Sequence, residues 1–168
     1  TAEQISAGKQ LSMQHARLVE FSSVIATDNG IQLSSVKAAD SNYPLRGELK
    51  SAAKPFAPES PGGVPQPGEA WVEARLLTAL DLEIGDSVEV GQKLLKLTRV
   101  LTYEPDRAGD FYSLTPRLLM SLEDLPATGV VQPGSRVKYS ELWRGTAEQI
   151  ATYRNLIKPG MAPSQQLL

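Results

Sequence analysis

Residues 73–103 read EARLLTALDLEIGDSVEVGQKLLKLTRVLTY, and this stretch contains both a helical and a strand pattern. At its start, apolar residues recur four positions apart, which predicts an amphipathic helix over residues 71–82 with Val72, Leu76 and Leu80 on one face. Residues 83–86 then predict a turn into a short strand, and Gly91-Gln92 a second tight turn. A longer strand follows, with one face expected to carry Leu95, Leu97, Leu101 and Tyr103. We expect Gly85 and Gly91 to need positive φ angles.

The N-terminal part predicts a helix followed by a hairpin. Thr1-Ala-Glu-Gln4 is a capping-box pattern, so we expect a helix from there to about Gln14. From Arg17 the apolar period becomes two, which predicts a strand. Residues 28–30 read Asp-Asn-Gly and favour a type I′ turn into a return strand over residues 31–39.

The remaining chain alternates loops with short elements. Residues 51–69 hold five prolines and predict a long surface loop, for which a plain connector is favoured over a functional role. Pro116 is suited to the first turn of a helix through Leu122. A strand over residues 135–142 precedes a second capping box, Thr-Ala-Glu-Gln at 146–149, and its helix is expected to end before Pro159. We expect the tail from residue 161 to be loosely held, and the fold class to be α+β.

Composition excludes several classes of function. The 168 residues carry 17 Lys and Arg against 19 Asp and Glu, and no basic run is dense enough to follow a nucleic-acid backbone or an anionic membrane. There is no cysteine and one histidine, which argues against disulfides and against zinc or copper sites. No apolar run approaches the roughly 20 residues that span a bilayer. The start at Thr1, without Met, predicts a piece of a longer protein.

No residue set forms a recognisable catalytic site. His15 is interpreted as a cation at a helix C-terminus rather than as the base of a triad. Glu104, Asp106 and Asp110 could hold calcium or act as an acid/base pair, but Arg107 lies among them and a solvated polar loop is favoured. Surface positions are expected for Glu123 and Asp124, turns for the glycines at 62, 63, 85 and 91, and core or rim packing for Trp71 and Trp143. We therefore expect no enzyme, no catalytic residue, no cofactor and no metal.

The opening stretch resembles a recurrent unit of ABC-transporter permeases of the FtsX/MacB/LolC type. In that family, a helix ending in L-x-L-x-x-G-D is followed by a V-x-V-G hairpin and a strand. The matching residues here are Leu80, Leu82, Gly85, Asp86, Val88, Val90, Gly91, Leu95 and Leu97. The segment VKAADSNYPLRGEL at 36–49 is similar to a family segment with Y-P-x-x-G, and LTPRLLMSLEDLPATGVVQP at 114–133 resembles the YbbP-like branch. The resemblance to that branch covers nearly the whole chain.

This resemblance implies a MacB-like periplasmic domain. A porter-like β-α-β lobe would come from residues 1–50 and 130–168, truncated at both ends and left with an unpaired sheet edge, and a β-rich Sabre-like lobe would be inserted over residues 51–129. It also implies flanking transmembrane helices and a place on the periplasmic face of a bacterial inner membrane. The implied partners are a cytoplasmic ATPase subunit, a second periplasmic domain or permease copy, and a lipid, lipoprotein or protein cargo.

Two other functions stay open beside the permease domain. The first is a stand-alone extracytoplasmic ligand-binding or adaptor module that shares the small β unit. The second is a hydrolase, which only the family's association with lipase operons suggests and which we do not favour. Apolar spans of about 20 residues in the flanking sequence would favour the permease. If the chain is such a domain, the loops at 51–69 and 104–111 are the expected contact surfaces, because loops on a rigid scaffold commonly carry recognition.

Overall fold

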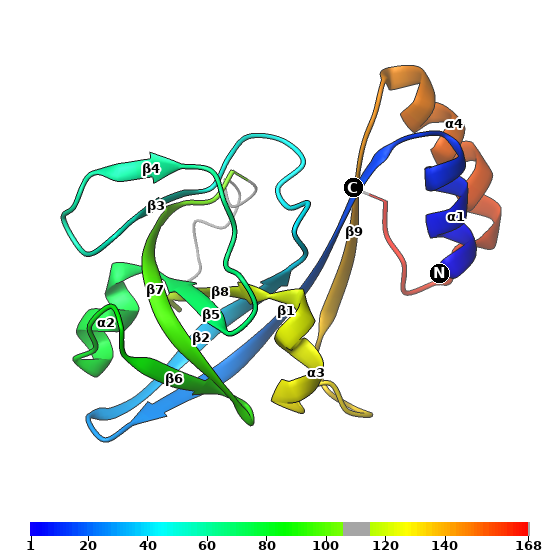
Figure 1. The fold of residues 1–168 in the computed structure, drawn as a ribbon. Helices are drawn as coiled ribbons and strands as arrows, with labels where there is room; N and C mark the ends of the chain where they lie inside the picture. Colours follow the sequence, from blue (N-terminus) through cyan, green and yellow to red (C-terminus); the bar gives the residue numbers. More distant parts are fainter. Residues whose placement is uncertain (106–114, 168) are drawn as a thin grey trace.

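The structure is a computed structural model, and it describes residues 1–105 and 115–167 (Figure 1). The described residues form one mixed sheet with short helices around it. The strands are β1 (Gln14–Thr27), β2 (Gly30–Ala39), β3 (Lys50–Ala52), β4 (Glu59–Pro61), β5 (Glu69–Val72), β6 (Ser87–Val90), β7 (Lys93–Tyr103), β8 (Arg117–Ser121) and β9 (Lys138–Arg144). The helices are α1 (Ala2–Gln10), α2 (Ala74–Leu80), α3 (Leu125–Thr128) and α4 (Ala147–Ile157), with short 3-10 turns at Leu122–Asp124 and Lys158–Gly160.

The strand order in the sheet is β4-β3-β7-β5-β8-β2-β1-β9, and β6 pairs with β7 beside this path. The pairs β2–β8 and β5–β7 are parallel, and the other pairs are antiparallel. The sheet is curled, so that β6 comes to lie near β1 (Figure 1). The largest core fills the inside of this curl with residues from β1, β2, β5, β6, β7, β8 and α2.

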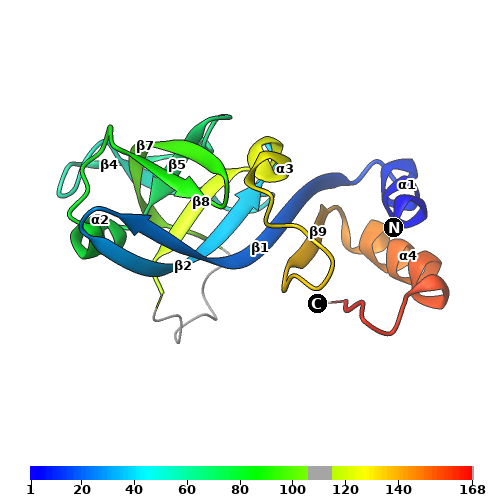
Figure 2. The ribbon, with the colours of Figure 1, turned by 90° about the horizontal axis from the view of Figure 1, so that it is seen from below.

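A second core lies on the other face of the sheet, around Trp71 and Leu119. The third core is separate and small. It joins Met13, Tyr153 and Ile157 where α1 and α4 pack together at the far ends of β1 and β9 (Figures 1 and 2). We call α1, α4 and residues 158–167 the helical end, and the curled strands with α2 and α3 the β body. The long strands β1 and β9 connect the two.

Three predicted features are confirmed. Both capping boxes form, with the Thr1 and Thr146 hydroxyls accepting from the backbone three residues on. The strand pair around residues 28–30 is a two-residue hairpin in which Thr27 pairs with Gly30. Its turn is not type I′, however, because neither Asp28 nor Asn29 has a positive φ. Gly85 and Gly91 have φ angles of 102° and 56°, as expected.

The helix expected from Pro116 to Leu122 is wrong. The segment is β8, with all five residues buried between β5 and β2. A short apolar run buried on both faces has no period that separates a strand from a helix, so only pairing with neighbours decides it. Strand pairing also corrects the start of the helix predicted over residues 71–82. Trp71 and Val72 belong to β5, and α2 begins at Ala74.

The Pro-rich segment 51–69 is also not a plain loop. Its first residues form β3, which turns back into β4 with Ala52 opposite Glu59. We call residues 53–58 the hairpin tip. The residues of β7 that were expected on one face do not all share it. Ala70 and Trp71 of β5 pair with Leu97 and Arg99 of β7, so Thr98 is an extra residue, a β-bulge. This bulge places Leu97 in the first core and Leu101 in the second.

The C-terminal tail is held more firmly than expected. The Gln4 and Gln165 side-chain amides hydrogen-bond each other at 3.1 Å, and Leu167 packs on the third core. At one edge of the described sheet, β9 pairs only with β1. The division into lobes at residues 50/51 and 129/130 stays a prediction, because the first core draws residues from both sides of those boundaries.

We predict that Gly91→Val destabilises the domain by at least about 1–3 kcal/mol. A Cβ there would lie 2.2 Å from the Thr128 carbonyl oxygen, which also accepts the Gln92 amide, and the φ of 56° is unfavourable for valine. The matched control is Gly85→Ala, where a Cβ meets no atom within 4 Å and only the φ penalty applies. Thermal unfolding measures both variants, and an unchanged melting temperature for Gly91→Val would contradict the prediction.

Candidate functional site

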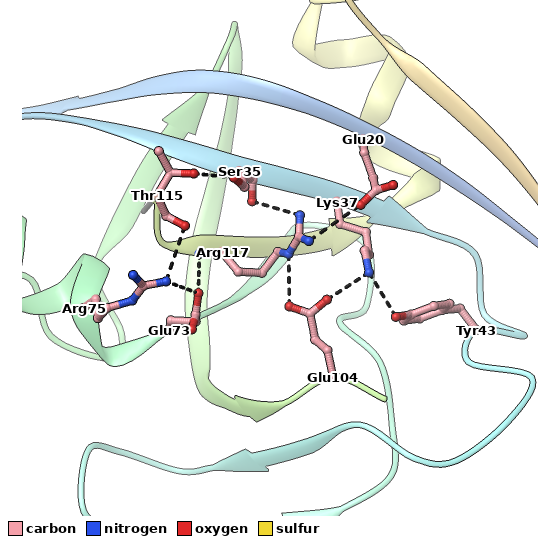
Figure 3. Close-up of polar contacts among 9 residues, drawn as sticks. All are labelled: Glu20, Ser35, Lys37, Tyr43, Glu73, Arg75, Glu104, Thr115 and Arg117. Atoms are coloured by element: carbon pink, nitrogen blue, oxygen red, sulfur yellow. Dashed lines mark hydrogen bonds and ion pairs between the residues drawn. The ribbon is translucent and has the colours of Figure 1, made fainter. Parts of the chain in front are cut away.

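The most concentrated group of buried charges surrounds Glu104, which directly follows β7 (Figure 3). One carboxylate oxygen accepts from Lys37 Nζ at 2.9 Å, and the other accepts from Arg117 Nε at 3.0 Å. The side chains of these three residues are only 2–5% exposed. We call Lys37, Glu104 and Arg117 the ionic cluster.

Strand pairing brings the two cations of the cluster together. β2 and β8 run parallel with Ser35 opposite Arg117, so Lys37 stands two residues further along on the same face. Glu104 reaches them from the end of β7, which lies two strands away from β8 in the sheet. The cluster therefore ties three strands that are distant in sequence.

Further polar side chains surround the cluster. Lys37 Nζ also donates to the Tyr43 hydroxyl at 3.2 Å, and an Arg117 terminal nitrogen lies 3.6 Å from the carboxylate of Glu20 (Figure 3). The Glu73 carboxylate accepts from the Arg117 backbone amide at 2.7 Å and pairs with Arg75 at 3.0 Å. In the described part of the chain, the two buried cations thus lie beside the carboxylates of Glu104 and Glu20, so the cluster consists of paired charges.

A second polar group joins the helical end to the strands. His15 lies in β1, where its ring stacks on Trp143 of β9 with centroids 4.2 Å apart, and its Nε2 is hydrogen-bonded to the Glu141 carboxylate. Glu141 also accepts from Arg17 at 2.9 Å. The Trp143 ring in turn packs against the ring of Tyr153 in α4, with the two ring centroids 5.0 Å apart. Burial, and secondly the Glu141 carboxylate, raise the pKa of the Tyr153 hydroxyl above its ordinary value.

The structure corrects several site predictions. His15 is not at a helix C-terminus, because α1 already ends at Gln10 and β1 begins at Gln14. Glu104 is not in a solvated loop, since it is 6% exposed and bridges two cations. Asp124 is also buried, and it accepts from the Gly68 amide at 2.7 Å, whereas Glu123 is exposed as expected.

Other site residues stand as follows. Asp106, Arg107 and Asp110 lie outside the described residues. Trp71 is a core residue at 4% exposure, and Trp143 packs against His15, as rim or core packing predicted. Over residues 1–105 and 115–167, no group of three His, Cys, Asp or Glu side chains is placed to hold a metal ion. No helix in this part of the chain is long and apolar enough to cross a membrane.

Sequence reasoning missed the ionic cluster. Lys37 and Arg117 each interrupt an apolar strand, and this was the available signal: a charge on a buried strand requires a partner. The identity of that partner could not be read, because 67 residues separate Lys37 from Glu104.

We predict that Glu104→Gln destabilises the domain by about 3–5 kcal/mol, because the change leaves Lys37 and Arg117 as adjacent buried cations. Urea unfolding of the purified domain measures it. The matched control is Glu59→Gln, which removes a carboxylate from an exposed pair with Lys50 at 4.0 Å and is expected to cost less than about 1 kcal/mol. Equal effects of the two changes would show that the cluster contributes no more than a surface ion pair.

Comparison with known proteins agrees with the fold and extends it. No protein-family model matches the chain. Over 162 residues, 96% of this chain, the sequence is 33% identical to the ABC transporter permease YbbP of Escherichia coli (strain K12), and the chain spans 18% of the length of that protein. The fold is similar to the crystal structure of the periplasmic region of MacB from Actinobacillus actinomycetemcomitans, with a TM-score of 0.57 and 14% identity over 92% of this chain and 72% of that one.

The two comparisons provide different kinds of evidence. The first is a sequence match over almost the whole chain, and the second is a match in fold at an identity too low to carry function. Together they confirm the expected α+β fold of the MacB-like type. The chain is therefore similar in sequence to a segment of the ABC transporter permease YbbP and has the fold of the periplasmic region of MacB.

Proposed function

We propose that this chain is the periplasmic domain of an ABC transporter permease, held at the outer face of a bacterial inner membrane. There it couples ATP hydrolysis by a cytoplasmic ATPase subunit to the handling or export of a lipid, lipoprotein or protein cargo. The observation that carries the proposal is the 33% identity to a segment of YbbP over 96% of the chain. A second periplasmic domain or permease copy is the proposed neighbour in the assembly.

The positions of the two chain ends support this arrangement. The hydrogen-bonded Gln4 and Gln165 bring residues close to both ends side by side on the helical end of the molecule (Figure 2). Membrane segments that continue from both ends would then reach the domain at one place. The β body would extend away from the bilayer, carried on the long strands β1 and β9 (Figures 1 and 2).

The internal contacts suit a body that moves as a unit. The ionic cluster locks the end of β7 to β2 and β8, and the third core with the His15–Trp143 stack fastens the helices to β1 and β9. A displacement at the helical end would therefore be passed to the β body instead of being absorbed locally. The proposed role is mechanical coupling without chemistry in this domain.

A stand-alone ligand-binding or adaptor module is the alternative. It would need no ATPase and no membrane attachment. Sequencing of the gene on both sides of this region separates the two functions, because a permease requires apolar spans of about 20 residues there. Co-purification of the full-length protein with an ATPase subunit is the corresponding biochemical test.

We predict that the hairpin tip contributes to transport. Replacing residues 53–58 by Asn-Gly keeps Ala52 opposite Glu59, so the domain should fold and melt normally. In the full permease, the transport readout should fall, while basal ATP hydrolysis persists because the ATPase docks across the membrane. The control is Pro133→Asn at the exposed 133–134 turn. Normal transport by the tip variant would reduce the hairpin to a connector.

We also predict that the purified domain hydrolyses neither ATP, nor esters, nor peptides. In the described part of the chain, His15 is held by Glu141 and Trp143 and contacts no hydroxyl nucleophile. Colorimetric assays over a range of protein concentrations test this, with His15→Ala as the matched variant. Turnover that scales with the domain and persists in His15→Ala would show a catalytic site that this structure does not reveal.

A further inference from the structure

Phe56 is the most exposed large apolar side chain in the described part of the chain, with a relative accessibility of 107%. It lies in the hairpin tip, between β3 and β4. Its backbone has a φ of 66°, in the left-handed region that favours glycine or asparagine. Phenylalanine at this position therefore carries two costs, exposure to water and backbone strain, and no packing against residues 1–105 or 115–167 offsets either one.

The hairpin holds Phe56 in a defined position. The Ala57 amide donates to the Lys54 carbonyl at 3.2 Å, and Pro55 and Pro58 restrict the backbone on either side. At the base, Arg99 donates to the side chain and the carbonyl of Ser51, at 2.6 and 3.3 Å. Ser51 is buried, so the base cannot shift without disturbing the core.

The base is tied on the other strand as well. Thr102 of β7 donates to the Glu59 carboxylate at 2.7 Å, and Glu59 lies 4.0 Å from Lys50. An aromatic side chain displayed on a pre-ordered turn loses little conformational entropy when it binds, and this is the property of an interface anchor.

We propose that Phe56 is an anchor that inserts into an apolar pocket on a soluble extracytoplasmic protein, with the adjacent Lys54 facing acidic groups at the rim of that pocket. This inference rests on the proposed function, because it requires the β body to face away from the membrane. It assigns one residue and one class of partner to a hairpin that the proposed function treats only as a contact surface.

The position of the tip argues for a protein and against a lipid surface. In both views the β3–β4 hairpin lies at the opposite end of the molecule from α1 and α4 (Figures 1 and 2). If the helical end adjoins the bilayer, the hairpin tip lies at the end of the molecule far from it. The tip also carries a single cation, Lys54, whereas stable attachment to an anionic membrane needs several basic residues or a lipid chain.

The strand next to the tip favours a side-chain anchor over pairing of backbones. β4 is an edge strand, but it has only three residues and ends in Pro61, which lacks an amide hydrogen. Such an edge is a poor template for adding another strand. Recognition at this corner of the molecule therefore falls to the side chains of the tip.

The test uses the full-length permease with its ATPase in native membranes. Phe56 is replaced by the photoreactive p-benzoylphenylalanine, and the same probe at exposed Ser60 of β4 is the matched control. We expect one protein adduct from position 56, none from position 60, and a weaker adduct when Lys54→Glu is added. No adduct at position 56, or adducts only with lipid or with a second permease copy, would overturn the proposal.

The adduct partner is then identified by mass spectrometry, purified and titrated against the unmodified full-length permease. Phe56→Gly should weaken its binding by about tenfold or more while the melting temperature holds or rises, because glycine relieves the φ strain. Phe56→Leu, which keeps an apolar side chain, should bind more tightly than Phe56→Gly. Equal affinity of the wild type and Phe56→Gly would overturn the anchor.

The same variants separate this inference from the proposed function. If replacing residues 53–58 impairs transport but Phe56→Gly does not, the permease role stands and the anchor is wrong. If the full-length protein neither associates with an ATPase nor with a membrane, the proposed function is wrong, and the adduct at position 56 then tests Phe56 as an anchor in an adaptor.

Discussion

Glu104 determines how the β body closes. It directly follows β7, and its two carboxylate oxygens bind Lys37 of β2 and Arg117 of β8. A carboxylate at 6% exposure is stable only when its charge is compensated, so these contacts favour the arrangement of the three strands that brings the cations to Glu104. The parallel β2–β8 pair, which has no short connection to enforce it, is positioned by the same contact.

The sheet contributes residues to the first core on one face and to the second core on the other. The ionic cluster adjoins the second core around Trp71 and Leu119, because Lys37 donates to the hydroxyl of Tyr43, which belongs to that core. The bulge at Thr98 turns Leu101 of β7 into that core after Leu97 has contributed to the first. Polar and apolar contacts therefore alternate along the strands, and the sheet is continuous from β4 to β9. A continuous sheet is suited to transmitting a displacement from the helical end to the opposite corner.

That opposite corner carries the features that the internal packing does not explain. The base of the β3–β4 hairpin is tied by Arg99 and Thr102, whereas the tip displays a strained phenylalanine to solvent. Natural sequences depart from local preference mostly where function requires it. In the proposed function, the helical end would adjoin the membrane and Phe56 at the opposite corner would contact the partner protein.

The sequence by itself determined the elements whose signals are local. The two capping boxes begin α1 and α4, the Asp-Asn-Gly turn joins β1 to β2, and Gly85 and Gly91 adopt positive φ, because each of these depends on residues a few positions apart. The motif around residues 73–103 also predicted the similarity to ABC transporter permeases that the match to a segment of YbbP supports. Only the tertiary structure decided that residues 117–121 form a strand, that His15 stacks on Trp143, and that Glu104 is buried between Lys37 and Arg117. These outcomes depend on partners that lie far away along the chain, and no local period or propensity encodes which partner a buried strand or a buried charge will meet.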